Sequence, residues 1–520
     1  MLAASGETIL YTSTHGPFEK GKDIITRTPT GEIRAYQLKC GDVGLSEWRA
    51  VSGEVNNLVE LAIEHVSAGL ITNFTAYLVT NGELKDPVLE QVRVANVSWE
   101  KRGVANKLLV IQKGELLERF RAAHGAYLPR ELADFRTFLE LILRPGTFVA
   151  QKSRAAQLLE DVLSIPVERS KLDVGRAAAS AVLLTAYITS APERAENHWA
   201  SFEYWVLAGA YILRLAEEHG SENEVWKVSF DLCEASAERA VEALDAECKT
   251  RPNLVEGGNP LLEGHTYSSR VTILAGIFAA SFLRKRIQRE ACDTEFFFNF
   301  AQKHLRNASL WGESAIPFGT MVALELEQEN RQLRAEELLI KFIRQIASEN
   351  GLGLAGRGMS NPYYSPEEAL RLLTGIDFLN LENFSGRSYC IETLVQMLAR
   401  RWRRQALASL WFSITRIQLC EYSPSDATEY FRWHSTAGKL NGSFPGEPQS
   451  WRELREVSEK LDRTEVPKTL LARPQFAPWF VLVYPHRFTP QIMNLIEAAL
   501  WGGSPQLEVN CNSNEKNRNS

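Results

Sequence analysis

The chain shows two patterns of hydrophobic and polar residues, and the change between them falls near residue 120. Before it, short alternating or β-branched runs are separated by turn signals such as Pro29-Thr30-Gly31 and Asn81-Gly82. Five strands are predicted, at residues 8–13, 23–28, 32–39, 74–80 and 107–112, with helices at 54–66 and from Asp86-Pro87 onward. The order β-β-β-α-β-α-β predicts a small α/β domain with a mixed sheet flanked by helices.

From about residue 115 the helical period dominates. Helices are predicted at 116–123, 131–143, 155–163, 176–189, 203–218, 224–247, 268–288, 294–305 and 334–348. Capping boxes at Ser365 and Ser450 predict two further helix starts, and one strand is predicted at 479–484. We therefore expect an α/β domain at 1–122, a helical domain at 123–350, a second helical domain with one strand at 351–502, and a disordered tail at 503–520.

Composition supports a globular protein of several domains. At roughly 100 to 200 residues per domain, 520 residues predict two to four domains. Hydrophobic residues make up 45% and charged residues 23%, which excludes disorder for the bulk of the chain. The net charge of −6 argues against nucleic-acid binding by bulk charge. Residues 1–125 carry 14 Lys plus Arg against 15 Asp plus Glu, so any DNA affinity depends on where the charges lie.

The cysteines and the apolar segments predict a cytoplasmic protein without a membrane span. The seven cysteines form no C-x-x-C pair and are odd in number, which fits neither a disulfide framework nor a zinc site. The first 16 residues lack the basic and apolar regions of a signal peptide. The apolar runs at 177–188 and 270–284 are shorter than the roughly 20 residues of a membrane span, so we expect buried helices there.

The chemistry that the sequence predicts lies in residues 16–41. If Thr28 pairs with Glu32 across the turn at 29–31, Asp23 lies opposite Gln37 in the hairpin. Lys39 shares the face of Gln37 because side chains alternate along a strand. A carboxylate and an amide oxygen suit magnesium, and a neighbouring lysine can orient or deprotonate water and offset phosphoryl charge.

At these residues the sequence resembles the Mrr-like restriction endonucleases of the PD-(D/E)xK nuclease superfamily. The match is Gly21-Lys22-Asp23, followed by Gln37-Leu38-Lys39 in place of the commoner ExK. It continues through Val79-Thr80-Asn81-Gly82 to residues 108–116, so it covers about the first 120 residues. The resemblance implies a restriction-endonuclease-like fold that cuts DNA with a metal-activated water.

The resemblance also implies roles for single residues. Asp23 and Gln37 would hold Mg²⁺ or Mn²⁺, and Lys39 would assist the nucleophile. Cutting both strands of DNA requires two sites, so a homodimer or larger oligomer is expected. By analogy, the protein would act in defence against foreign DNA, with the helical region sensing a trigger, choosing a target or assembling protomers.

One part of the family pattern is missing. The family fold begins with a helix that commonly supplies a glutamate to the metal, and residues 1–6 match only the end of such a helix. Three explanations remain open: a helix encoded upstream, substitution by Glu7 or Glu19, or a domain that binds DNA without cutting it. Glu19 is the better substitute because it lies in the loop that leads to Asp23.

Weaker signals lie elsewhere in the chain. Candidate nucleic-acid contacts are Lys22, His15 and the cluster Arg400, Arg401, Arg403 and Arg404, although such clusters are usually solvated helix faces. The G-x-G-x-x-G match at 351–356 follows a predicted helix, which favours a helix end over a dinucleotide site. The alternative function is a catalytically inactive nuclease fold that serves as a nucleic-acid-binding or scaffold protein.

Overall fold

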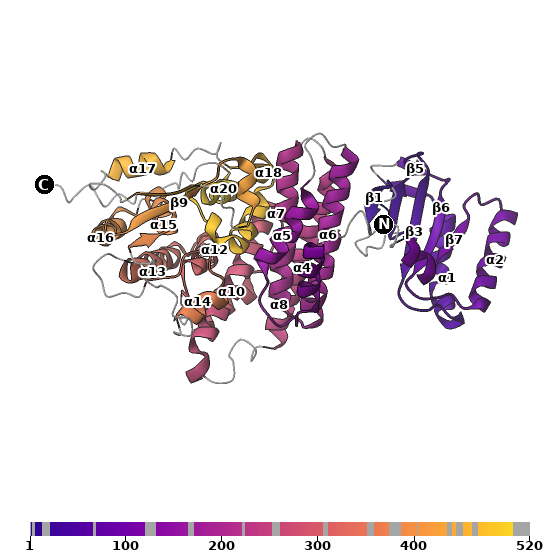
Figure 1. Ribbon diagram of the computed structural model, residues 1–520, viewed down its shortest axis with the longest axis horizontal. Helices are drawn as coiled ribbons and strands as arrows, with labels where there is room; N and C mark the ends of the chain where they lie inside the picture. The colour runs from indigo at the N-terminus through magenta and orange to yellow at the C-terminus, as the bar shows by residue number, and fades with distance from the viewer. Residues whose placement is uncertain are drawn as a thin grey trace. The chain divides into compact units, whose positions relative to one another are not determined.

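The chain forms two compact units. The computed structural model describes residues 2, 6–12, 21–65, 69–119, 132–164, 171–220, 224–251, 260–304, 310–350, 358–373, 386–401, 403–433, 439–443, 451–459 and 466–502. The N-terminal unit comprises Met1–Phe135 and Glu168–Leu183, and the helical unit comprises Arg136–Val167 and Leu184–Ser520. Figure 1 shows the sheet and helices of the first unit and the helices of the second.

A five-stranded mixed sheet is the centre of the N-terminal unit. Its strands are β1 (Thr8–Thr12), β2 (Ile24–Arg27), β3 (Ile33–Lys39), β6 (Thr75–Thr80) and β7 (Leu108–Ile111), in the order β1-β2-β3-β6-β7. The first three strands form an antiparallel meander, whereas β3, β6 and β7 run parallel. All five predicted strands are confirmed, and each end lies within one residue of the prediction.

Helices α1 (Leu45–Glu60) and α2 (Asp86–Lys101) make the two crossovers between the parallel strands. The predicted helix at 54–66 is misplaced, because α1 begins nine residues earlier and the chain is extended from Leu61. Residues Ile63–His65 instead form β4, which pairs with β5 (Gly69–Ile71). Ile63 fits the helical spacing but reaches the core from a strand, with 2% exposure.

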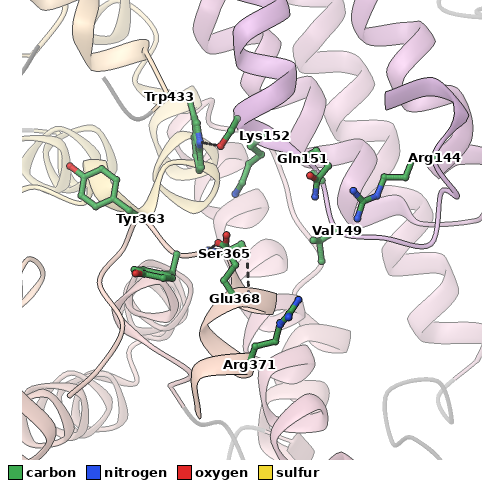
Figure 2. A pocket seen from close by; sticks show the side chains of 12 residues that line it. Arg144, Val149, Gln151, Lys152, Tyr363, Ser365, Glu368, Arg371 and Trp433 are labelled. Atoms are coloured by element: carbon green, nitrogen blue, oxygen red, sulfur yellow. Dashed lines mark hydrogen bonds between the residues drawn. The ribbon is translucent and has the colours of Figure 1, made fainter. Parts of the chain in front are cut away.

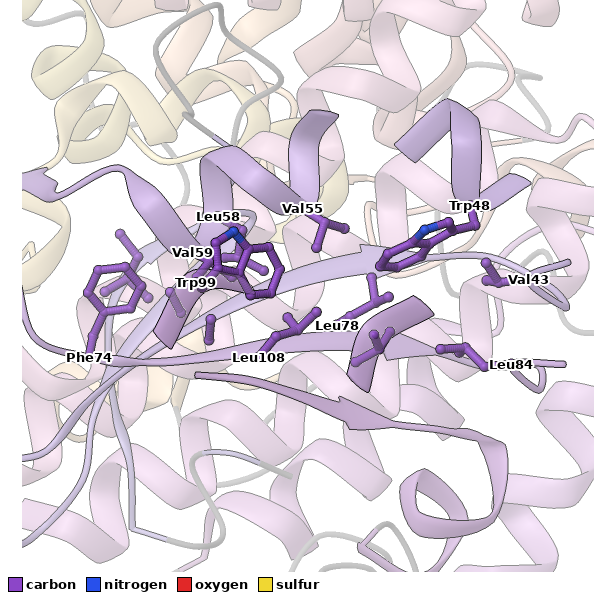
Figure 3. Close-up of a cluster of buried hydrophobic side chains, with 14 of the residues drawn as sticks. Val43, Trp48, Val55, Leu58, Val59, Phe74, Leu78, Leu84, Trp99 and Leu108 are labelled. Carbon is purple, nitrogen blue, oxygen red and sulfur yellow. The ribbon is translucent and has the colours of Figure 1, made fainter. Parts of the chain in front are cut away.

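Both helices bury their apolar sides on one face of the sheet. Val55 and Leu58 of α1 and Trp99 of α2 join Leu78 and Leu108 of the sheet in a single core, which Figure 3 shows. These side chains are at most 2% exposed. We call this side of the sheet the helix face.

The other face of the sheet has its own, smaller apolar cluster, and we call it the tyrosine face. Tyr36 stacks on Tyr77 with 5.0 Å between ring centroids. Val79 and Ile111 complete the cluster, and Leu116 packs against it from the helical residues after β7. Both faces of the parallel strands are therefore covered, as such strands require.

After β7 the chain is mainly helical. The helices are α4 (Leu132–Leu143), α5 (Lys152–Leu163), α6 (Lys171–Arg194), α7 (His198–His219), α8 (Lys227–Thr250), α10 (Pro260–Ile287), α11 (Glu295–His304), α12 (Ile316–Gln328), α13 (Gln332–Asn350), α14 (Pro366–Leu373), α15 (Ile391–Arg400), α16 (Arg404–Ile414), α17 (Trp451–Glu459), α18 (Lys468–Leu471), α19 (Ala477–Val483) and α20 (Pro490–Trp501). The helices predicted between residues 131 and 348 are confirmed, although α12 was not predicted. The capping box at Ser365 is also confirmed, since its hydroxyl and the Glu368 carboxylate each accept a backbone N–H from the other residue. Ser450 lies outside the described residues.

The centre of the helical unit consists of helices that are buried on all sides. Every residue of α7 from Ala200 to Ala216 is buried, as is α12 from Ile316 to Leu326. By length and composition, 173–194 and 266–287 are apolar enough to cross a membrane, but 56% and 67% of their apolar windows are buried inside the protein. Buried core helices of a globular protein pass the same test.

Two features of the helical unit differ from the sequence-based expectation. The strand predicted at 479–484 is wrong, because these residues belong to α19 and the turn after it. A continuous apolar run fits a buried helix as well as a buried strand, and Pro478 favours a helix start. A small sheet of β8 (Arg387–Ser388), β9 (Gln418–Ser423) and β10 (Lys439–Ser443) was not predicted.

Candidate active site

The hairpin of β2 and β3 has the predicted register. Ile24 pairs with Tyr36, and the pairing continues to Arg27 with Ile33. The described pairing ends at Ile24, and the Asp23 amide donates at 2.8 Å to the carbonyl of Tyr36, the residue that pairs with Ile24. The Asp23 side chain lies beside that of Gln37 on the helix face, because Gln37 donates a hydrogen bond to its carboxylate.

Asp23 and Gln37 make direct contact. The Asp23 Oδ2 atom accepts hydrogen bonds from Gln37 Nε2 at 2.9 Å and from the Leu38 amide at 2.6 Å. Gln37 is only 5% exposed, and its Oε1 atom has no hydrogen-bond partner among the described residues. A buried amide oxygen that accepts no hydrogen bond is unfavourable unless another group binds to it. This oxygen and the half-buried carboxylate are the kinds of ligand that a hard cation prefers.

Lys39 lies two residues further along the same face of β3. Its Nζ atom forms an ion pair with Glu54 Oε2 of α1 at 2.5 Å, and the two side chains are 23% and 51% exposed. Glu54 was not predicted as a site residue. It directly precedes Val55, one of the buried residues that pack α1 on the sheet, and that position is the only sequence signal for it.

The segment before β2 is fixed against α1. Gly21 has a φ of +74°, and a Cβ atom there would lie 2.4 Å from the Glu54 carbonyl oxygen. Lys22 is 2% exposed and donates from Nζ to the Asn57 carbonyl at 3.2 Å. The burial of the Lys22 ammonium group against the helix contradicts the prediction that Lys22 contacts nucleic acid.

The carboxyl ends of β3 and β6 meet beside these residues. Lys39 pairs with Thr80, and Thr80 Oγ1 donates to the Gly41 carbonyl at 2.5 Å. The Gly41 amide in turn donates to Asn81 Oδ1 at 2.6 Å. The Thr80-Asn81-Gly82 turn thus holds the chain after Lys39 in place, at the sheet edge where parallel α/β folds place their ligands.

Glu7 does not belong to this group, contrary to one of the predicted substitutions. Its carboxylate accepts from Thr26 Oγ1 at 2.5 Å, Arg34 Nη1 at 2.8 Å and Tyr36 Oη at 3.0 Å. Tyr36 defines the tyrosine face, so Glu7 lies on the opposite side of the sheet from Asp23. The other proposed substitute, Glu19, and the proposed phosphate contact, His15, lie outside the described residues.

Most of the predicted arginine cluster is buried in the helical unit. Arg400 and Arg401 are 5% and 8% exposed, and both pair with Glu497 at 2.8 Å. Burial alone would raise the pKa of Glu497, but the two guanidinium groups outweigh it and lower that pKa. The prediction that Arg400 and Arg401 contact nucleic acid is therefore wrong. Arg403 pairs with Glu336 at 3.0 Å, and only Arg404 of the four is exposed.

The fit of a metal ion to the N-terminal site is limited. Among the described residues there is no group of three or more His, Cys, Asp or Glu side chains placed to hold a metal. Asp23 and Gln37 Oε1 offer one carboxylate and one neutral oxygen, which suits Mg²⁺ because this ion keeps several of its waters. No family model, curated protein or solved structure matches the chain.

Proposed function

We propose that the N-terminal unit is a metal-dependent DNA endonuclease domain. The observation that carries the proposal is that Asp23, Gln37 and Lys39 lie on one face of the sheet, where the buried Gln37 Oε1 atom has no hydrogen-bond partner within the described part of the chain. The antiparallel meander followed by parallel crossovers supports it, since this arrangement agrees with the restriction-endonuclease-like fold expected from the sequence.

Each residue has a distinct task in this proposal. Asp23 and Gln37 would hold Mg²⁺ or Mn²⁺, which would supply a more acidic bound water and positive charge for the phosphate. The Leu38 amide and Gln37 Nε2 fix the Asp23 carboxylate. The Lys39 ammonium provides a positive charge for a phosphate oxygen, and Glu54 keeps it at the end of β3.

The proposal extends to the whole chain. Cleavage of duplex DNA would need two copies of the site, so the active form is a homodimer or a larger oligomer. The helical unit would sense, target or assemble, and the protein would act in the cytoplasm, in defence against foreign DNA.

A second candidate is a catalytically inactive nuclease fold that binds nucleic acid or acts as a scaffold. Two observations favour it. Asp23 Oδ2 already accepts two hydrogen bonds. The described residues also bring no second carboxylate into contact with Asp23.

Cleavage of supercoiled plasmid DNA by the purified full-length protein separates the two candidates. We expect nicking or linearisation in Mg²⁺ or Mn²⁺ that is lost with EDTA. Asp23→Asn and Lys39→Ala should each reduce the rate by about a hundredfold, the scale for removing one preorganised electrostatic group.

The matched controls are Asp42→Asn and Lys85→Ala. Asp42 and Lys85 form an ion pair at 3.1 Å with side chains more than half exposed, so these variants remove the same charges from the same unit. Their cleavage should equal that of the wild type. Metal-independent DNA binding without cleavage would instead support the inactive fold, and wild-type cleavage by Lys39→Ala would disprove the role of Lys39.

A further inference from the structure

The helical unit contains a cavity that the nuclease proposal does not use. Its volume is about 510 Å³, within the range of roughly 300–1,000 Å³ that is common for small-molecule sites. Three separate segments form its walls: residues 144–153, residues 363–371 and Trp433 (Figure 2). All three segments belong to the helical unit.

The cavity wall is rich in positive charge. Arg144 and Arg371 reach toward it from the loop before α5 and from α14 (Figure 2). The Arg144 Nε atom is buried and has no hydrogen-bond partner among the described residues. Lys152 also lines the cavity, but its charge is balanced by Glu203 at 2.7 Å. Glu368, the one acid among the described lining residues, accepts a hydrogen bond from the Ser365 backbone amide as part of the α14 cap.

Aromatic rings form the other side of the cavity. Tyr363 stacks on His486 with 4.8 Å between ring centroids. Trp433 is held by a hydrogen bond from its indole nitrogen to Ser153 Oγ at 3.0 Å. Because both rings are fixed by neighbours, the entropy lost when a planar ligand packs against them is small.

The loop that carries Arg144 is also fixed in place. Asn197 Nδ2 donates to the carbonyls of Gly146 and Phe148, both at 2.9 Å. The Gln151 amide donates to Tyr204 Oη at 2.8 Å. The loop that carries Arg144 is therefore held in place before any ligand binds.

We propose that this cavity binds a nucleoside phosphate. The arginines recognise the phosphate, because guanidinium groups form strong charge-assisted hydrogen bonds with phosphate oxygens. The base packs against the tyrosine and tryptophan rings, which offer stacking surfaces at low entropic cost. The proposal does not depend on the nuclease activity, since binding is measured without DNA.

Isothermal titration calorimetry on the full-length protein tests this proposal. The probes are ATP, GTP, AMP, GMP, adenosine, guanosine and inorganic phosphate, each titrated separately. We expect at least one nucleotide to bind at least tenfold more tightly than both its nucleoside and phosphate. Arg144→Ala should weaken that binding by about ten- to a hundredfold, the scale for a charged hydrogen bond to phosphate.

Two further variants make the test decisive. Arg371→Ala changes an exposed residue of α14, so it serves if Arg144→Ala does not fold. Arg154→Ala removes the same charge from α5 but lies outside the cavity wall, where it pairs with Glu140 at 2.6 Å, so binding should be unchanged. Absence of nucleotide binding overturns the proposal. So does phosphate binding as tight as that of the nucleotides, or an equal loss of affinity in Arg154→Ala.

Discussion

The Gln37→Glu variant tests the proposed metal site through stability alone, without relying on cleavage. The substitution replaces the Gln37 Nε2 donor, which lies 2.9 Å from Asp23 Oδ2, with a second carboxylate oxygen. The lost hydrogen bond accounts for about 1 kcal/mol. Two carboxylates that relax to about 4 Å repel by about 4 kcal/mol at an effective dielectric constant of about 20. Because Asp23 is partly exposed, we reduce the expected total destabilisation to about 2–4 kcal/mol.

Hydrogen–deuterium exchange of the β2–β3 hairpin in the full-length protein measures this change. A loss of about 2–4 kcal/mol speeds exchange of the hairpin amides by roughly 30- to 1,000-fold where exchange follows local opening. Stability of the variant should increase as the pH falls, because protonation of one carboxyl group removes the repulsion. Mg²⁺ at a hundred times its dissociation constant should restore about 2.7 kcal/mol, which slows exchange by about a hundredfold.

The Gln37→Met variant separates the two contributions. It removes the same hydrogen bond but adds no charge, so its exchange should be at most about tenfold faster and should show neither the pH dependence nor the Mg²⁺ response. If Mg²⁺ leaves the exchange of Gln37→Glu unchanged, the Asp23–Gln37 pair is not a metal site. The inactive-fold candidate would then be the better description of the N-terminal unit.

Three other predictions concern packing and buried charge. Gly21→Ala should lower the free energy of unfolding by about 2–4 kcal/mol in denaturant titrations, because its Cβ would lie 2.4 Å from the Glu54 carbonyl oxygen. In the control Gly31→Ala, the new Cβ meets no atom within 4 Å, so only the positive φ of this residue should cost stability, about 1 kcal/mol. Glu497→Gln should cost about 3–5 kcal/mol in the same titrations, since it leaves two buried arginines without their shared carboxylate. Burial raises the pKa of Glu313 to about 7, so its contribution to stability is present below about pH 4.5 and is lost as the pH rises to 7. Glu313→Gln should abolish this loss of about 2–3 kcal/mol, measured as the change in unfolding free energy between pH 5 and pH 8.

The sequence predicted the N-terminal strands well because their register depends on local information. The turn at Pro29-Thr30-Gly31 sets the pairing of Thr28 with Glu32, and the alternation of side chains then brings Asp23 and Gln37 together on one face. Residues joined by a short hairpin can be placed without knowledge of the rest of the fold. The same reasoning does not locate Glu54, because its contact with Lys39 depends on how α1 packs across the sheet.

The errors in the helical unit have a different physical origin. A run of arginines in the sequence does not show whether acidic side chains lie next to it in the fold. Arg401 contacts Glu327 and Glu497, which are 74 and 96 residues away in the chain. The run from Trp479 to Tyr484 is apolar at every position, so it has no periodicity from which helix and strand could be distinguished. In both places the outcome depended on contacts between segments distant in the sequence.

The ion pair between Lys39 and Glu54 bears on both candidate functions, and its exposure decides how strongly. Lys39 is 23% and Glu54 51% exposed, and a pair with this much solvent contact is worth about 0–1 kcal/mol. A DNA phosphate can therefore replace Glu54 as the partner of the Lys39 ammonium at little cost in free energy, so the ion pair does not argue against catalysis. The three hydrogen bonds to the buried Glu7 carboxylate are different, because releasing it would leave a buried charge without partners. Of the two glutamates, only Glu54 is free to move toward a metal or substrate, and it is the carboxylate to test after Asp23.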